Sequence, residues 1–153
     1  MDKKLKALII LAGFLIMSGP LANAGESRTA TIDDMKGEVL VRLAGTDWQA
    51  AKEDMVLHEK DEIRTLAGAK ATLLLDEGKT GKLELREKSF FRLNTLKKDD
   101  QTDKKTTLLD LAEGKLRVYA KKLKDGEKFE VRTPTAIAGV RGTVFDVSVD
   151  EKK

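Results

Sequence analysis

The clearest structural pattern lies in residues 129–149, which read Phe-Glu-Val-Arg-Thr-Pro-Thr-Ala-Ile-Ala-Gly-Val-Arg-Gly-Thr-Val-Phe-Asp-Val-Ser-Val. The first three residues alternate apolar and charged, and the last five, from Phe145 to Val149, alternate apolar and polar. Alternation with a period of two is typical of a half-buried strand, because successive side chains point to opposite faces. We therefore expect a strand at each end of this segment. Thr133 should be extended, because the following Pro134 disfavours a helical residue before it.

The same alternation recurs upstream, and turn-forming residues separate the runs. Short strands at intervals of about ten residues predict a single all-β domain. The spacing suits a short irregular β-solenoid, a sandwich or a small barrel. The alternating runs are Val39–Leu43, Leu83–Leu85, Phe91–Leu93, Leu116–Val118 and Phe129–Val131, and the turn signals are residues 44–46, 76–78, 113–114 and 125–126.

Three other segments carry weaker expectations. Residues 72–75 are more continuously apolar and predict a central strand buried on both faces. Residues 50–57 have a mild helical pattern, which indicates either one helical turn or a polar connection. Residues 97–105 are nearly all charged or polar, and we expect a long, exposed, mobile hairpin loop there.

The first 24 residues have the order of a secretory signal peptide. Three lysines precede an apolar run from Ala7 to Met17, and Ala22-Asn-Ala24 follows the Gly-Pro break. A membrane-spanning helix needs about 20 apolar residues, and this run has eleven. We therefore expect cleavage after Ala24, export to the periplasm or the medium, no permanent membrane anchor, and a mature chain of residues 25–153 in which residues 25–28 are a flexible lead-in.

The charge of the whole chain owes much to this segment. The chain carries 29 Lys and Arg against 26 Asp and Glu. Removing residues 1–24 takes away three lysines and one aspartate, which leaves 26 against 25. A nucleic-acid-binding protein shows a strong basic excess, so we expect no nucleic-acid partner.

The inventory of catalytic residues is poor, so we expect neither an enzyme nor a cofactor. His58 is the single histidine and there is no cysteine, whereas zinc sites usually draw on several of both. No serine lies in a nucleophile-elbow motif, and residues 139–142 lack the spacing and lysine of a phosphate loop. The many carboxylates leave a paired-acid hydrolase as a weak alternative. We therefore predict no catalytic and no metal-binding residues.

Two residues are candidates for contact with a partner or ligand. Trp48 lies beside a turn, where it would either stack on a sugar ring or a partner, or close one end of the core. Arg141 is the only charge between Thr133 and Val144. We expect Arg141 to be partly buried, with its donors bound to main-chain carbonyls or an acid across the fold. Its alternative role is to hold the carboxylate or main chain of a partner.

Residues 129–147 strongly resemble the signature of the FecR-like domain, which occurs in the periplasmic part of bacterial signalling proteins. The resemblance extends back through Glu113-Gly-Lys-Leu-Arg-Val, residues 71–78, residues 60–65 and Gly37-Glu-Val-Leu-Val, and so covers about residues 30–149. The most specific block of the signature, whose role we expect to be structural, consists of Thr133, Pro134, Thr135, Ala136, Gly139, Val140, Arg141, Gly142 and Thr143.

The resemblance implies a role in envelope sensing, signalling or assembly. The best-known members also have a cytoplasmic segment that governs a sigma factor, and only six residues precede the apolar run here. We therefore expect a stand-alone exported module without direct sigma-factor regulation, which binds an envelope protein or associates with itself. The alternative is a carbohydrate- or cell-wall-binding domain that uses Trp48 and the loops beside it.

Overall fold

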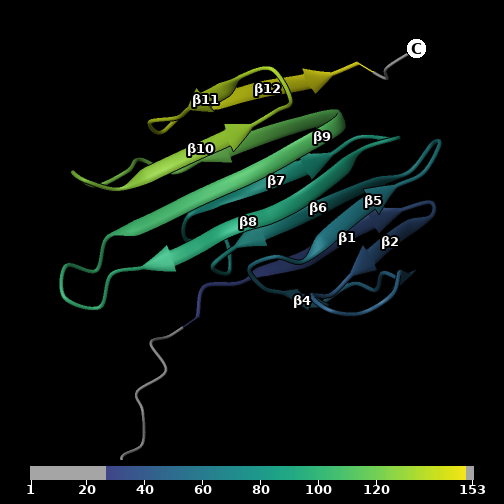
Figure 1. Ribbon diagram of the computed structural model, residues 1–153, viewed down its shortest axis with the longest axis horizontal. Helices are drawn as coiled ribbons and strands as arrows, with labels where there is room; N and C mark the ends of the chain where they lie inside the picture. Colours follow the sequence, from purple (N-terminus) through teal and green to yellow (C-terminus); the bar gives the residue numbers. More distant parts are fainter. Residues whose placement is uncertain (1–26, 151–153) are drawn as a thin grey trace, which may run out of the picture.

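The computed structural model describes residues 27–150, and within that range it contains strands, turns and loops but no helix. Twelve strands form one curled sheet (Figure 1), so the predicted all-β class is confirmed. The strands are β1 (Ala30–Lys36), β2 (Val39–Arg42), β3 (Gln49–Ala50), β4 (Val56–Leu57), β5 (Glu62–Thr65), β6 (Lys70–Leu75), β7 (Gly81–Leu85), β8 (Phe90–Lys98), β9 (Lys105–Ala120), β10 (Lys128–Arg132), β11 (Ile137–Gly139) and β12 (Val144–Val149).

The long strand β9 joins two layers. Its first part lies between β8 and β10, in the order β3-β2-β5-β8-β9-β10-β11, which we call the β8 layer. Its second part lies between β7 and β12, in the order β4-β1-β6-β7-β9-β12, which we call the β7 layer. Every pairing is antiparallel except the one between β9 and β10. A solenoid stacks parallel rungs, so that alternative is wrong; the one sheet curls into a half-barrel whose two layers face each other.

Strand β9 passes between the layers at Gly114. Gly114 has a φ of +93°, which side chains disfavour, and a Cβ there would overlap Ser89. The Ser89 hydroxyl accepts a hydrogen bond from the Lys115 N–H at 3.0 Å and donates one to the Arg86 carbonyl at 2.9 Å. Glycine therefore lets two main chains approach closely where the strand changes layer.

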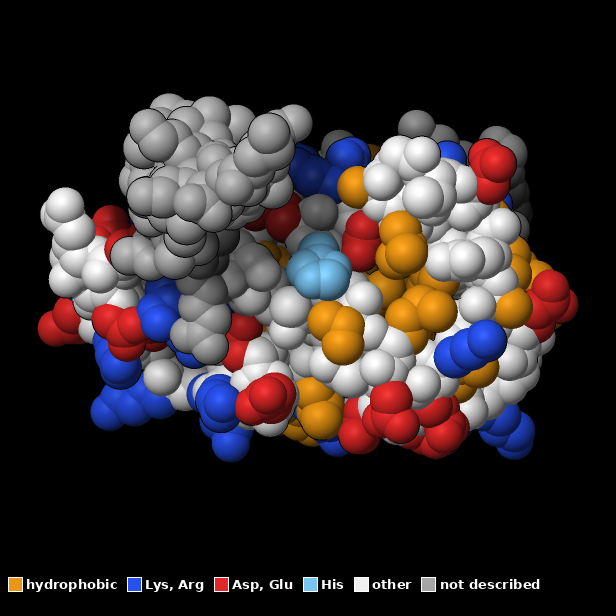
Figure 2. All heavy atoms as spheres, turned by 90° about the horizontal axis from the view of Figure 1, so that it is seen from below, with side chains coloured by type: hydrophobic (Ala, Val, Ile, Leu, Met, Phe, Trp, Pro, Cys, Tyr) orange, Lys and Arg blue, Asp and Glu red, His pale blue; other side chains and the backbone are white. Residues whose placement is uncertain are grey.

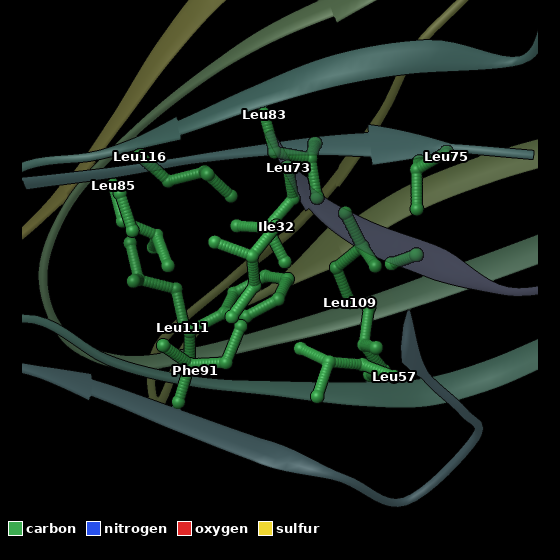
Figure 3. Packing of buried hydrophobic residues seen from close by; sticks show 14 of the residues in the cluster. Ile32, Leu57, Leu73, Leu75, Leu83, Leu85, Phe91, Leu109, Leu111 and Leu116 are labelled. Carbon is green, nitrogen blue, oxygen red and sulfur yellow. The ribbon is translucent and has the colours of Figure 1, made fainter. Parts of the chain in front are cut away.

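The core lies between the two layers. Figure 3 shows apolar side chains from β1, β4, β6, β7, β8 and β9 pointing toward one another. Phe91 of the β8 layer and Ile32 of the β7 layer are both fully buried there. Because alternate residues of each strand face inward, the residues between them form the outer faces of the two layers.

Several local expectations need correction. Of the two alternatives for residues 50–57, the helical turn is wrong and the connection is confirmed, because the segment runs as a loop from β3 to β4. The strand at residues 72–75 is β6, in which Thr72 and Leu74 are only half-buried. The exposed hairpin loop expected within residues 97–105 is confirmed, since it joins β8 to β9, and the carboxylate of Asp99 accepts hydrogen bonds from two main-chain N–H groups of this loop, at 3.0 and 2.8 Å. Strand β1 has no counterpart in the expected strands.

The lead-in ascribed to residues 25–28 is also wrong at its last residue. Arg28 is 5% exposed. Its Nε donates to Asp76 at 3.0 Å and its Nη2 lies 2.9 Å from the same carboxylate. Its Nη1 donates to the carbonyl of Thr106 and to the hydroxyl of Thr107, both at 2.9 Å, and to the carbonyl of Lys97 at 3.3 Å. Arg28 thus joins the segment that precedes β1 to β8 and β9.

The predicted signal peptide, residues 1–24, lies outside the described residues. Within residues 27–150 there is no helix of the length and apolarity that crossing a membrane requires.

Candidate binding surface

Trp48 lies on the outer face of the β8 layer, where it precedes β3. Its indole ring is half-buried but lies outside the apolar core, so the expectation that it closes one end of the core is wrong. The ring of Phe90, from β8, contacts it edge-to-face with centroids 5.9 Å apart and an angle of 64° between the planes. Edge-to-face geometry is the arrangement that aromatic pairs favour.

Two guanidinium groups cover these rings. The Cζ atom of Arg42, from β2, lies 4.9 Å from the centroid of Trp48. The Cζ atom of Arg64, from β5, lies 5.3 Å from the centroid of Trp48 and 4.9 Å from that of Phe90. Cation–π contacts of this kind contribute about 0.5–1 kcal/mol each at exposed sites. We call Arg42, Trp48, Arg64 and Phe90 the Trp48 surface.

Strand register brings these residues together. Arg64 pairs with Leu40 on β2 and with Phe90 on β8. The inward neighbours of the outer residues, such as Ile63 and Phe91, are fully buried, which fixes the outward direction of Arg64 and Phe90. The Trp48 surface is therefore held by a rigid sheet, although its members come from four separate segments.

The charges on this face are unequal. The Nε of Arg42 donates to the carboxylate of Glu62 at 2.6 Å. The side chain of Arg64 has no hydrogen bond or ion pair within residues 27–150, and it contacts the two aromatic rings instead. Arg92 on β8 lies opposite Glu62 on β5 and opposite Asp110 on β9. Its buried Nε has no hydrogen-bond partner. Carboxylates thus lie beside Arg42 and Arg92, whereas Arg64 has none among residues 27–150 and is the group on this face that can pair with an anion.

Arg141 is located elsewhere and in a different environment from the one expected. It is exposed, in the loop between β11 and β12, and among residues 27–150 it has no ion pair or hydrogen bond through its side chain. The prediction that it is partly buried is therefore wrong. Gly142 beside it has a φ of +61°, and a Cβ at this position would overlap the main chain of Lys122. Strands β3 and β11 are the opposite edges of the β8 layer, so Trp48 and Arg141 do not form one site.

The rest of the signature shapes the end of the β8 layer. Thr133 closes the turn between β10 and β11: its N–H donates to the carbonyl of Ala136 at 2.8 Å, and its hydroxyl accepts from the N–H of Ala136 at 3.1 Å. Val140 is buried, and its N–H donates to the carbonyl of Phe129 at 2.9 Å. The signature positions thus lie as follows: Pro134 and Thr135 at the exposed turn, Gly139 in β11, and Thr143 bound through its carbonyl to Ala120.

Two further observations concern chemistry. His58 is exposed on the face that Figure 2 shows, where the single histidine is pale blue and apolar side chains lie beside it. Among residues 27–150, no three His, Asp or Glu side chains are grouped so as to hold a metal ion. A surface hollow of about 740 Å³ lies between the β10–β11 turn and the end of β12.

The FecR protein family model matches residues 61–153. The chain therefore belongs to the FecR protein family, and this membership associates it with envelope signalling. The match begins at Asp61, whereas the resemblance read from the sequence reached back to about residue 30. No curated protein and no solved structure matches the chain.

Proposed function

We propose that this chain is a non-catalytic, exported FecR-family module that binds a protein partner in the cell envelope through the Trp48 surface. The observation that carries the proposal is the group of Trp48, Phe90 and two guanidinium groups on an outer sheet face. Tryptophan and arginine dominate the binding energy of protein interfaces. A rigid aromatic pair also loses little conformational entropy when a partner covers it.

The charges suggest which partner segment fits. Arg64 has no acidic partner within the described residues, whereas Arg42 is already paired with Glu62. A partner that brings an aspartate or glutamate beside an apolar side chain would pair Arg64 and cover Trp48 in one contact. Electrostatic complementarity of this kind raises the association rate and selects among partners.

The alternative of a carbohydrate- or cell-wall-binding domain rests on the same tryptophan. A sugar ring stacks on an open aromatic face, whereas the ring of Trp48 is already contacted by Arg42, Arg64 and Phe90. A glycan would have to displace a guanidinium group to stack. The contacts therefore favour a protein partner over a neutral sugar.

The test compares capture of envelope proteins with binding to purified cell wall, for the wild type and three variants. Trp48→Ala and Arg64→Lys should each weaken protein capture about tenfold or more, since lysine keeps the charge but not the planar stacking. Tyr119→Ala is the matched control, because Tyr119 also lies under a cation, with Lys82 Nζ 4.3 Å from its centroid, but on the β7 layer. Binding to cell wall that depends on Trp48, without any captured protein, would replace the proposal with the alternative.

A further inference from the structure

Strand β12 forms an edge of the β7 layer. Within residues 27–150 it pairs only with β9, and Figure 1 shows it at the rim of the sheet. The N–H of Ala120 donates to the carbonyl of Thr143 at 3.1 Å, which makes these two a hydrogen-bonded pair. Hydrogen-bonded pairs alternate along an antiparallel ladder. The main-chain groups of Val144, Asp146 and Ser148 therefore point away from β9, along the free edge.

The inward side chains of β12 are incompletely covered. Phe145, Val147 and Val149 face the core, yet all three are only half-buried. Their cross-strand partners on β9, Val118 and Leu116, are 0% and 1% exposed. Among residues 27–150, the apolar face of the β7 layer therefore continues to its edge and ends there uncovered, beside main-chain donors and acceptors that have no partner strand.

We infer that β12 pairs antiparallel with β12 of a second copy of this chain, about a two-fold axis at Val147. In this register Val147 lies opposite its own copy, and Phe145 lies opposite Val149 of the other chain. These are the non-hydrogen-bonded pairs, in which side chains approach most closely. Three apolar pairs then cover the half-buried row, and the main chains of Asp146 and Ser148 bond across the axis.

The outer side chains select this register over its neighbour. With the axis at Val147, Asp146 lies opposite Ser148 of the second copy, whose hydroxyl is a donor. With the axis one residue earlier, Asp146 would lie directly opposite its own copy, and like charges in that position are destabilising. Arg117 donates hydrogen bonds to the carboxylate of Asp146 at 2.7 and 2.8 Å, which holds that carboxylate on the outer face of β12. In this position it would face its own copy in the second register but not in the first.

The contact is limited to one strand edge, so its area falls in the range of weak and transient interfaces. We expect a reversible dimer whose fraction rises with concentration. This pairing is separate from the Trp48 surface, which lies on the outer face of the other layer. A failure of one proposal therefore does not entail failure of the other.

Sedimentation velocity of the purified protein over a range of concentrations tests the inference, with two opposite substitutions at one exposed position. Ser148→Asp places a carboxylate opposite Asp146 of the second copy, and should raise the dimer dissociation constant about tenfold or more. Ser148→Lys places an ammonium there, and should lower the constant several-fold at low salt. Both effects should shrink as salt rises, because screening weakens exposed charge pairs.

Effects of these substitutions on the stability of the monomer can be told apart from their effects on the dimer. Within its own sheet Ser148 lies opposite Lys115, so an aspartate at this position gains a favourable neighbour in the monomer and a lysine an unfavourable one. The expected effects on the dimer run the opposite way. Ser148→Pro gives a third check: the N–H it removes points away from β9, where edge strands tolerate proline, so the variant should melt like the wild type and remain monomeric.

Three results would overturn the inference. One is a protein that stays monomeric at every concentration. Another is a dimer whose dissociation constant is the same in both charge variants. The third is a dimer that survives Ser148→Pro but is lost in Trp48→Ala, since it would place self-association at the Trp48 surface.

Discussion

Arg28 should be the most important single ion-pairing residue for the stability of this fold. In the replacement Arg28→Ala, the carboxylate of Asp76 loses the guanidinium contacts at 3.0 and 2.9 Å. The carbonyls of Thr106 and Lys97 and the hydroxyl of Thr107 lose their bonds from Nη1. The variant thus removes the donors of one side chain and leaves their acceptors in place.

The expected cost follows from the environment of Asp76. Removing one partner of a buried ion pair costs about 3–5 kcal/mol, because the other charge stays desolvated. Asp76 keeps the hydroxyl of Thr80 and the Lys105 ammonium at 3.6 Å. We therefore expect the lower end of that range, about 3 kcal/mol. Against a typical total of about 5–15 kcal/mol for a domain, this is a large fraction.

Urea denaturation measures this loss directly. With a denaturant dependence of about 1–3 kcal/mol per molar urea, a loss of about 3 kcal/mol moves the midpoint by about 1–3 M. Arg28→Lys should recover little, because one ammonium cannot reproduce the planar fork. Arg141→Ala is the control, and should stay within about 0.5 kcal/mol of the wild type because Arg141 is exposed. If Arg28→Ala is as stable as that control, the reasoning about the buried arginine is refuted.

Three further predictions concern acid stability, strand β9 and export. Burial disfavours the charge of Asp76, but the hydrogen bonds from Arg28 and Thr80 outweigh burial and lower the pKa of this carboxyl. The stability that Asp76 contributes should therefore be present above about pH 4 and fall as the pH drops below that value. In unfolding curves measured from about pH 5 to pH 2, Asp76→Asn should make the stability depend less on pH. Gly114→Ala should cost about 2–4 kcal/mol in the same urea assay, from the positive φ together with the overlap with Ser89; an unchanged midpoint would contradict the account of the β9 crossing. Intact mass of the exported protein should place the mature N-terminus at Gly25, and retention of residues 1–24 would rule out cleavage after Ala24.

The strand pattern was predictable because its cause is local. Alternation within residues 83–85, 91–93 and 116–118 records which side chains face the core, and all three segments lie in strands. Strand β1 escaped prediction because its second half, with Asp33 and Asp34 after Ile32, is exposed and interrupts the alternation. The curl of the sheet depends on β9 pairing with four other strands, which no local pattern records.

The burial and the partners of Arg28 and Arg141 could not be predicted from the sequence. The chemistry expected of Arg141, with donors bound to carbonyls and to an acid across the fold, occurs at Arg28 instead. Apolar neighbours suggested burial at Arg141, but that loop is on the surface. At Arg28 the partners are 48 to 79 residues away in sequence, so only the folded chain brings them together.

The Trp48 surface was predictable only in part. Trp48 was a candidate contact because it is the single tryptophan. Alternation also places Arg64 and Phe90 opposite the buried Ile63 and Phe91, and so outward. The order of the strands could not be predicted from the sequence. That order places β3, β2, β5 and β8 side by side and so brings the residues of the Trp48 surface together.

Site-directed photo-crosslinking tests most directly whether a partner binds at the Trp48 surface. The chain has no cysteine, so a single one can carry the crosslinker at a chosen position. Ala50→Cys puts it in β3, two residues from Trp48 and therefore on the same face, whereas Lys70→Cys puts it on β6 in the β7 layer. We predict that position 50 crosslinks to an envelope protein, that position 70 does not, and that adding Trp48→Ala abolishes the adduct. Equal adducts from both positions, or an adduct from position 50 that survives Trp48→Ala, would contradict the proposed binding surface.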